Sequence, residues 1–159
     1  MNWKLIVVGG TVFYAAQWVV GMATGVFIHN GVLVPYYAAT QEFWRPELNQ
    51  VPPDMAALMP RWIASGLFSS FLLAFVFGWI RSSLAGAGWL KGLKFGAILS
   101  IFSAGFMLGW SGVFNLPDAI WGWWWFESVL YFLFGGMVLG WFAQRYVQAP
   151  SPVPGSDRS

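Results

Sequence analysis

Cysteine is absent from the 159 residues of this chain, and histidine occurs once, as His29. Without cysteine there can be no disulfide, no iron–sulfur cluster and no zinc site built on thiolates. A single imidazole also excludes a bis-histidine haem and any metal site that needs two imidazoles from one chain. We therefore predict no metal and no cofactor, and ligation of a pigment by His29 alone stays open.

Charge is scarce as well. Charged residues make up 9% of the chain, whereas soluble domains carry about 25%. Hydrophobic residues account for 58%, which excludes intrinsic disorder. The net charge of +2 is too small for a nucleic-acid footprint. Membrane lipids are thus expected partners and nucleic acid is not, so the chain reads as an integral membrane protein.

The few charges divide the chain into four long apolar intervals. Each interval holds the roughly 20 apolar residues that a helix needs to cross a bilayer. We predict an all-α, integral membrane four-helix bundle in a domain spanning residues 1–145. Its helices are expected near 4–29, 58–80, 90–113 and 119–144.

Lysine and arginine are distributed unequally between the two sides of this bundle. One side carries both termini and the loop between the second and third helices; its cations are Lys4, Arg81, Lys91, Lys94, Arg145 and Arg158. The other side has only Arg45 and Arg61. By the positive-inside rule, both termini are predicted to be cytoplasmic, in a multi-pass protein of the bacterial inner membrane.

Two segments are predicted to lie outside the bilayer. The outer loop, residues 30–57, contains aromatic side chains among polar ones and is expected to form an amphipathic lid at the interface. Within it, Thr40 is a candidate cap of a short helix that Pro46 limits. Residues 146–159 form a Pro/Ser-rich cytoplasmic tail.

Glu127 is the residue most indicative of a site, because a carboxylate within a membrane span is costly. Arg61 and His29 approach from the same side of the membrane, with Gln17 deeper in the first helix. These four residues predict an outward-facing polar cluster that binds a ligand or acts as a gate. The alternative is that Glu127 is protonated and joins helices by hydrogen bonds. No pair of groups is poised for catalysis, so we expect no enzyme activity.

Small residues recur at four-residue spacing in three of the predicted helices, and such stripes favour close helix packing in lipid. In the last helix, Gly136 and Gly140 lie nearly opposite Glu127, so this helix is expected to contact two neighbours. The two glycines are candidate contacts for a partner helix or lipid. The same helix begins with the indoles of Trp121, Trp123, Trp124 and Trp125. These indoles fit either an interfacial aromatic belt or a contact surface for a partner or lipid.

Short motifs add a family resemblance. Phe27-Ile28-His29 is followed by Tyr37-Ala38-Ala39-Thr40 and by Trp44-Arg45-Pro46, and a glutamate lies in the last helix. This pattern resembles a family of small bacterial four-span membrane proteins of unknown function. The resemblance implies the four-span fold and draws attention to His29, Tyr37, Thr40, Trp44, Arg45 and Glu127. It implies no activity.

These patterns are compatible with two functions. The first is a non-catalytic subunit that packs into a larger membrane protein complex of respiratory or photosynthetic type, with other membrane subunits as partners. The alternative is a small transporter or ligand-binding membrane protein with a polar pocket around Glu127 and Arg61.

Overall fold

The computed structural model describes residues 2–147, and every regular element in this range is a helix. Four helical segments are long and apolar enough to cross a membrane. The first, Leu5–Val32, consists of a π-helical turn η1 (Leu5–Gly9), helix α1 (Gly10–Phe27) and a second π-helical turn η2 (Ile28–Val32). The others are α3 (Met55–Ile80), α4 (Gly88–Ser111) and α5 (Asp118–Tyr146). The prediction of an all-α multi-pass membrane protein is confirmed.

The spans begin and end within a few residues of the predicted positions. Helix α3 starts three residues early because Asp54 acts as its N-cap: the Asp54 carboxylate accepts a hydrogen bond from the Ala57 N–H at 3.1 Å. Helix α5 starts at Asp118, whose negative charge suits the positive end of the helix dipole. Only the first two residues of the predicted tail, Tyr146 and Val147, belong to the described residues.

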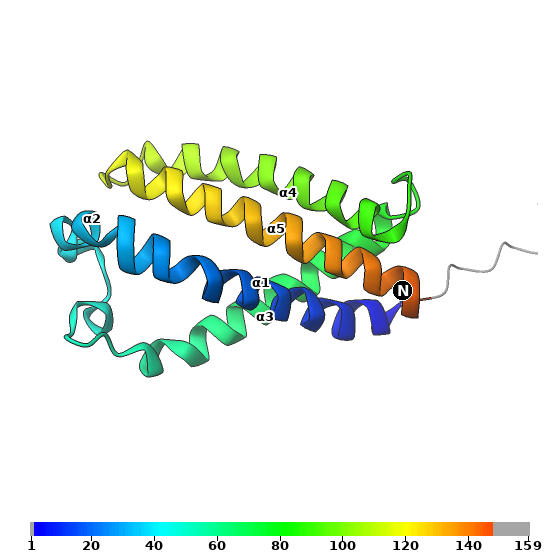
Figure 1. Ribbon diagram of the computed structural model, residues 1–159, viewed down its shortest axis with the longest axis horizontal. Helices are drawn as coiled ribbons and strands as arrows, with labels where there is room; N and C mark the ends of the chain where they lie inside the picture. Colours follow the sequence, from blue (N-terminus) through cyan, green and yellow to red (C-terminus); the bar gives the residue numbers. More distant parts are fainter. Residues whose placement is uncertain (1, 148–159) are drawn as a thin grey trace, which may run out of the picture.

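The four spans do not pack equally closely against one another (Figure 1). Helices α4 and α5 run side by side along most of their length, and α1 lies beside α5. Helix α3 crosses α1 and then diverges from it toward the outer segment, which comprises residues 33–54. Both ends of the described chain lie together, as four crossings require. Following the predicted orientation, we name this end the inner end and the end with the outer segment the outer end.

Glycines bring α4 and α5 into backbone contact in the inner half. A Cβ on Gly92 would collide with the backbone of Gly136, and a Cβ on Gly140 would collide with the backbone of Gly88. Gly96 likewise faces the backbone of Phe132. We call Gly88, Gly92, Gly96, Gly136 and Gly140 the glycine seam. Beside it, large buried side chains fill the inner core; these are Leu5, Phe13, Phe77, Phe95, Leu139 and Phe142.

The outer segment contains more regular structure than the sequence suggested. It holds helix α2 (Val34–Ala39) and two 3₁₀ turns, Gln41–Phe43 and Pro46–Asn49. As expected, Thr40 precedes a short helical turn that ends before Pro46. The expected capping bond is wrong, because the Thr40 hydroxyl donates back to the Tyr36 carbonyl at 2.8 Å and not to that turn. Pro46 starts the second turn, since its fixed φ suits a first helical position.

Candidate functional site

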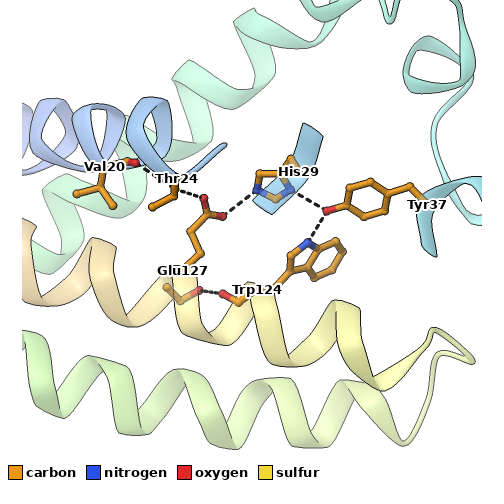
Figure 2. Close-up of polar contacts among 7 residues, drawn as sticks. Val20, Thr24, His29, Tyr37, Trp124 and Glu127 are labelled. Atoms are coloured by element: carbon orange, nitrogen blue, oxygen red, sulfur yellow. Dashed lines mark hydrogen bonds and ion pairs between the residues drawn. The ribbon is translucent and has the colours of Figure 1, made fainter. Parts of the chain in front are cut away.

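The outer ends of α1 and α5 are joined by a chain of polar side chains (Figure 2). Glu127 and Trp124 lie three residues apart on α5, so both point from one face toward α1. Thr24 lies near the end of α1, and His29 lies in the π-helical turn that follows. Tyr37 reaches in from α2. We call Thr24, His29, Tyr37, Trp124 and Glu127 the outer polar network.

Glu127 is the buried end of this network, with only 5% of its surface exposed. One carboxylate oxygen, Oε1, is in hydrogen-bond contact with the Thr24 hydroxyl. The other, Oε2, lies 2.9 Å from the imidazole Nε2 of His29. Both carboxylate oxygens are thus satisfied inside the chain, which offsets the cost of removing the acid from water.

His29 links the buried acid to the outer segment. Its Nδ1 lies 2.7 Å from the Tyr37 hydroxyl, and its side chain remains 36% exposed. The π-helical turn at Ile28–Val32 sets this position: the Leu33 N–H donates five residues back to the Ile28 carbonyl at 2.9 Å, which widens the turn around His29. The imidazole therefore contacts both the acid and the outer segment while part of its surface stays exposed.

Hydrogen counting shows that the network accommodates two proton arrangements, which differ by one proton because Tyr37 keeps its own proton in both. An indole N–H only donates, so Trp124 donates to the Tyr37 hydroxyl oxygen at 2.9 Å. If Tyr37 then donates to Nδ1 of His29, the Nε2–H of a neutral imidazole donates to an ionised Glu127. If instead Glu127 carries the proton, it can donate to Nε2, and Nδ1–H then donates to Tyr37. The two arrangements need no movement of heavy atoms.

The Thr24 hydroxyl adds a second such choice. It lies within hydrogen-bond distance of both the Val20 carbonyl, at 3.0 Å, and the Glu127 carboxylate. One hydroxyl proton cannot serve both acceptors. Thr24 therefore donates to an ionised Glu127, or donates to Val20 while it accepts from a protonated Glu127. Proton storage and transfer are the chemistry that this site can perform.

Aromatic side chains fasten the outer segment over the network. The Trp44 indole N–H donates to both the Tyr37 carbonyl at 3.2 Å and the Thr40 hydroxyl at 3.1 Å. The rings of Tyr37 and Trp44 meet edge to face with centroids 5.3 Å apart, and Trp44 meets Trp124 at 5.8 Å. Burial raises the pKa of Tyr37, which keeps its hydroxyl protonated as the network requires.

The structure brings together only part of the predicted polar cluster. Glu127 and His29 are in direct contact. Arg61, in contrast, is exposed and makes no side-chain hydrogen bond within residues 2–147; its charge acts on Glu47 of the outer segment. Gln17 is half-buried, deeper in α1, and contributes no hydrogen bond to the outer polar network. The reason is geometric, because α3 diverges from α1 at this end and takes Arg61 with it.

The four indoles of α5 have different roles. Trp124 belongs to the outer polar network, and Trp125 donates from its indole N–H to the Ser100 carbonyl of α4 at 3.1 Å. Trp123 packs edge to face on Phe27 of α1, with centroids 5.8 Å apart. Trp121 packs in the same way on Trp124. Each of the four indoles therefore contacts another side chain or the backbone of the same chain.

Both predicted faces of α5 are also occupied within the chain. Gly136 and Gly140 contact α4 in the glycine seam, and Glu127 contacts α1. Sequence reasoning did not single out Thr24 as part of the site. A hydroxyl near the end of the same span as His29 was the available signal, because a buried acid needs donors beyond a single imidazole.

Within the described residues, no group of three or more His, Asp and Glu side chains is placed to hold a metal ion. In comparisons with known proteins, no family model, no curated protein and no solved structure matches this chain. The resemblance to small four-span bacterial proteins stays a prediction.

Proposed function

We propose that this chain is a non-catalytic, multi-pass subunit of the bacterial inner membrane that packs against a transmembrane helix of a larger complex. One observation carries this proposal: the outer half of α4 presents an open apolar groove of about 600 Å³ that no other part of the described chain fills. Glycines and apolar or aromatic side chains line this groove; they include Ile101, Phe102, Gly105, Phe106, Gly109 and Trp110.

The two small-residue faces of α4 have unequal surroundings. Gly96 contacts the backbone of α5, whereas a Cβ on Gly105 or Gly109 would meet nothing within 4 Å. Gly105 follows Gly96 by nine residues, or about 180° around the helix at 100° per residue. The groove therefore faces away from α5. A helix of this chain already occupies the first face, and the same spacing of small residues on the second face suits a helix from another protein.

The test uses native membranes solubilised in a mild detergent and separated by blue-native electrophoresis. The wild-type chain should migrate in a complex larger than its own 17.7 kDa. The double variant Gly105→Leu/Gly109→Leu fills the groove and should release the chain from this complex. Gly25→Leu is the matched control, because Gly25 on α1 also faces open space. A photo-crosslinker at Phe106, an exposed residue that lines the groove, should capture a membrane protein.

Two results would contradict this function: a wild-type chain that migrates alone, or a groove variant that keeps the complex intact. In either case lipid acyl chains fill the groove, and it has no subunit partner.

A second function, that of a small transporter or ligand-binding protein, is favoured by the contact between buried Glu127 and half-exposed His29. Ionisable groups within a membrane span typically mark paths for protons or ions. The rings of Tyr37, Trp44 and Trp124 lie at the His29 end of the network, and aromatic ring faces attract small protonated amines and not anions. In this second function the site consists of the outer polar network, without the Arg61 that the sequence predicted for it.

Proteoliposomes loaded with a pH-sensitive dye test this second function. If it holds, small amines added outside should cause a pH change inside that Glu127→Gln reduces at least tenfold, since one carboxylate carries the exchangeable proton. Arg61→Gln removes a charge from the same end of the protein but not from the outer polar network, so it should keep full activity. Equal rates in Glu127→Gln and wild-type vesicles would leave Glu127 a purely structural role.

A further inference from the structure

A second cavity lies at the inner end, far from the outer polar network. It has a volume of about 360 Å³ and lies between the end of α3, the start of α4 and the end of α5. The loop of residues 81–87 forms part of its wall. Its lining combines apolar and polar groups; they include Phe77, Arg81, Gly88, Lys91, Gln144 and Val147. We call this cavity the basic pocket.

The charges of the basic pocket are all of one sign. Arg81 and Lys91 both line it, and no acidic residue of the described range 2–147 does. The wider inner end repeats the pattern, because the acidic residues of the described chain lie in the outer segment and in the first ten residues of α5. These are Glu42, Glu47, Asp54, Asp118 and Glu127. Two neighbouring cations without a carboxylate repel one another, and an anion between them relieves that repulsion.

Both cations of the pair are partly removed from water. Burial lowers the pKa of Arg81, and among the described residues no carboxylate opposes this effect. A guanidinium presents five N–H donors in a planar fork, a geometry that matches the oxygens of a phosphate. Without a carboxylate partner, these donors are available to a bound anion.

The loop beside Arg81 is held in place by lysine side chains. Lys91 donates from Nζ to the Arg81 carbonyl at 3.1 Å, and Lys94 donates to the Ala85 carbonyl at 2.9 Å. The Lys91 ammonium has two further N–H groups for a ligand. Across the pocket, Gln144 accepts from the Gly88 N–H at 2.7 Å through Oε1, which leaves its amide NH₂ as another donor.

Tryptophans place the basic pocket at the level of lipid headgroups. The side chains of Trp79, Trp89 and Trp141 are exposed around the inner end of the spans. Indoles concentrate at the membrane–water interface, where the phosphate groups of phospholipids also lie. Basic pockets between transmembrane helices at this depth are suited to anionic headgroups.

We propose that the basic pocket binds a phosphate group through Arg81 and Lys91. The phosphate can come from an anionic phospholipid of the adjacent leaflet or from a soluble phosphate ester, since both offer the same oxygens to the two cations.

The test measures lipid bound to the purified full chain by native mass spectrometry. Phosphatidylglycerol and zwitterionic phosphatidylcholine are offered in equal amounts. The wild-type chain should retain phosphatidylglycerol preferentially, and added salt should weaken this preference. The double variant Arg81→Gln/Lys91→Gln should lose about 30-fold in affinity for phosphatidylglycerol, the factor expected for two basic residues near an anionic lipid.

Lys4→Gln/Arg145→Gln is the matched control, because it removes two cations from the inner end outside the lining of the pocket. It should change the affinity less than about threefold, as expected for screened charges that do not contact the ligand. Lys91→Arg retains both the charge and a donor to the loop, and should keep the lipid preference even if the glutamine variant does not fold.

Glycerol 3-phosphate distinguishes the two sources of phosphate. If it displaces phosphatidylglycerol and binds alone in a calorimetric titration, the ligand is a soluble ester. If it does neither while phosphatidylglycerol binds, the ligand is a lipid. Equal retention of both lipids by the wild-type chain, without binding of the soluble ester, would overturn the proposal, as would equal losses in the pocket variant and the control.

Discussion

The glycine seam and the outer polar network hold helices together by opposite means. In the seam, the absence of side chains lets the backbones of α4 and α5 touch, and Gln144 adds a hydrogen bond from the Gly88 N–H at the inner end. In the network, side chains from α1, α2 and α5 meet through hydrogen bonds around a buried acid. Within lipid, where apolar burial gives helices little reason to associate, these are the two available sources of specific attraction.

The seam and the network also differ in how they should respond to pH. Backbone contact at the seam has one geometry and no titratable group, so its strength should not change with conditions. The network has two proton arrangements with the same heavy-atom positions, so protonation can change its strength without repacking. We expect the inner half to act as the scaffold and the outer half as the responsive part.

The largest effect is expected from breaking the seam. Gly92→Leu places a branched side chain against the backbone of Gly136, which cannot rotate away as a side chain would. The variant should lose about 3 kcal/mol of unfolding free energy or more, at the upper end of overpacking costs. Equilibrium unfolding in mixed detergent measures this loss. Gly105→Leu on the open face of the same helix should stay within about 0.5 kcal/mol of wild type.

Removing the acid from the network should have the next largest effect. Glu127→Leu leaves the His29 Nε2 without its partner and the Thr24 hydroxyl with Val20 alone. We expect the free energy of unfolding to fall by about 2 kcal/mol. An unsatisfied buried polar group can cost more than this, and a hydrogen bond between membrane helices typically contributes less. The same unfolding measurement applies. Glu127→Gln keeps an acceptor for Thr24 and should lose about half as much, so equal losses would contradict the hydrogen-bond account.

A smaller and more local effect is expected in the outer segment. Tyr37→Phe removes the hydroxyl that contacts His29 and accepts from Trp124. The cost should be about 1 kcal/mol and confined to the outer segment. Hydrogen exchange should accelerate in residues 34–49 and remain unchanged along the seam. Tyr36→Phe is the control, because the Tyr36 side chain is exposed and its hydroxyl makes no hydrogen bond within the described residues.

The smallest effect is expected at the surface ion pair of the outer segment. The Arg45 guanidinium donates to the Glu47 carboxylate at 3.1 Å and lowers the pKa of Glu47 below its ordinary value of 4.5. At a pH near these two pKa values, Glu47 therefore binds more protons in the unfolded chain than in the folded chain. The small stabilisation is complete above pH 4.5 and is lost as the pH falls through the lowered pKa.

Arg45→Gln should return the pKa of Glu47 toward 4.5, as measured by NMR titration of labelled glutamate side chains. Lys4→Gln removes a cation from the inner end and should leave the Glu47 titration unchanged, because solvent ions screen charges at that distance. An unchanged titration in Arg45→Gln would show that the ion pair does not form in solution.

Hydrophobicity and charge in the sequence determined the number of spans and their limits, because each span must satisfy its backbone internally and match the thickness of the bilayer. They also identified Glu127 and His29, since an ionisable group in an apolar run is visible without knowledge of the fold. Spacing alone exposed the small-residue stripes of the last two helices.

Only the tertiary structure decided which of these features meet. It paired Glu127 with His29 and Thr24 and left Arg61 apart, because the direction of α3 depends on side-chain packing with α1 and not on any periodicity. It also separated two stripes that look alike in sequence: Gly92 and Gly96 are covered by α5, and Gly105 and Gly109 are open. Helical spacing fixes which residues share a face, but the neighbour that covers that face is chosen by the packing of the whole bundle.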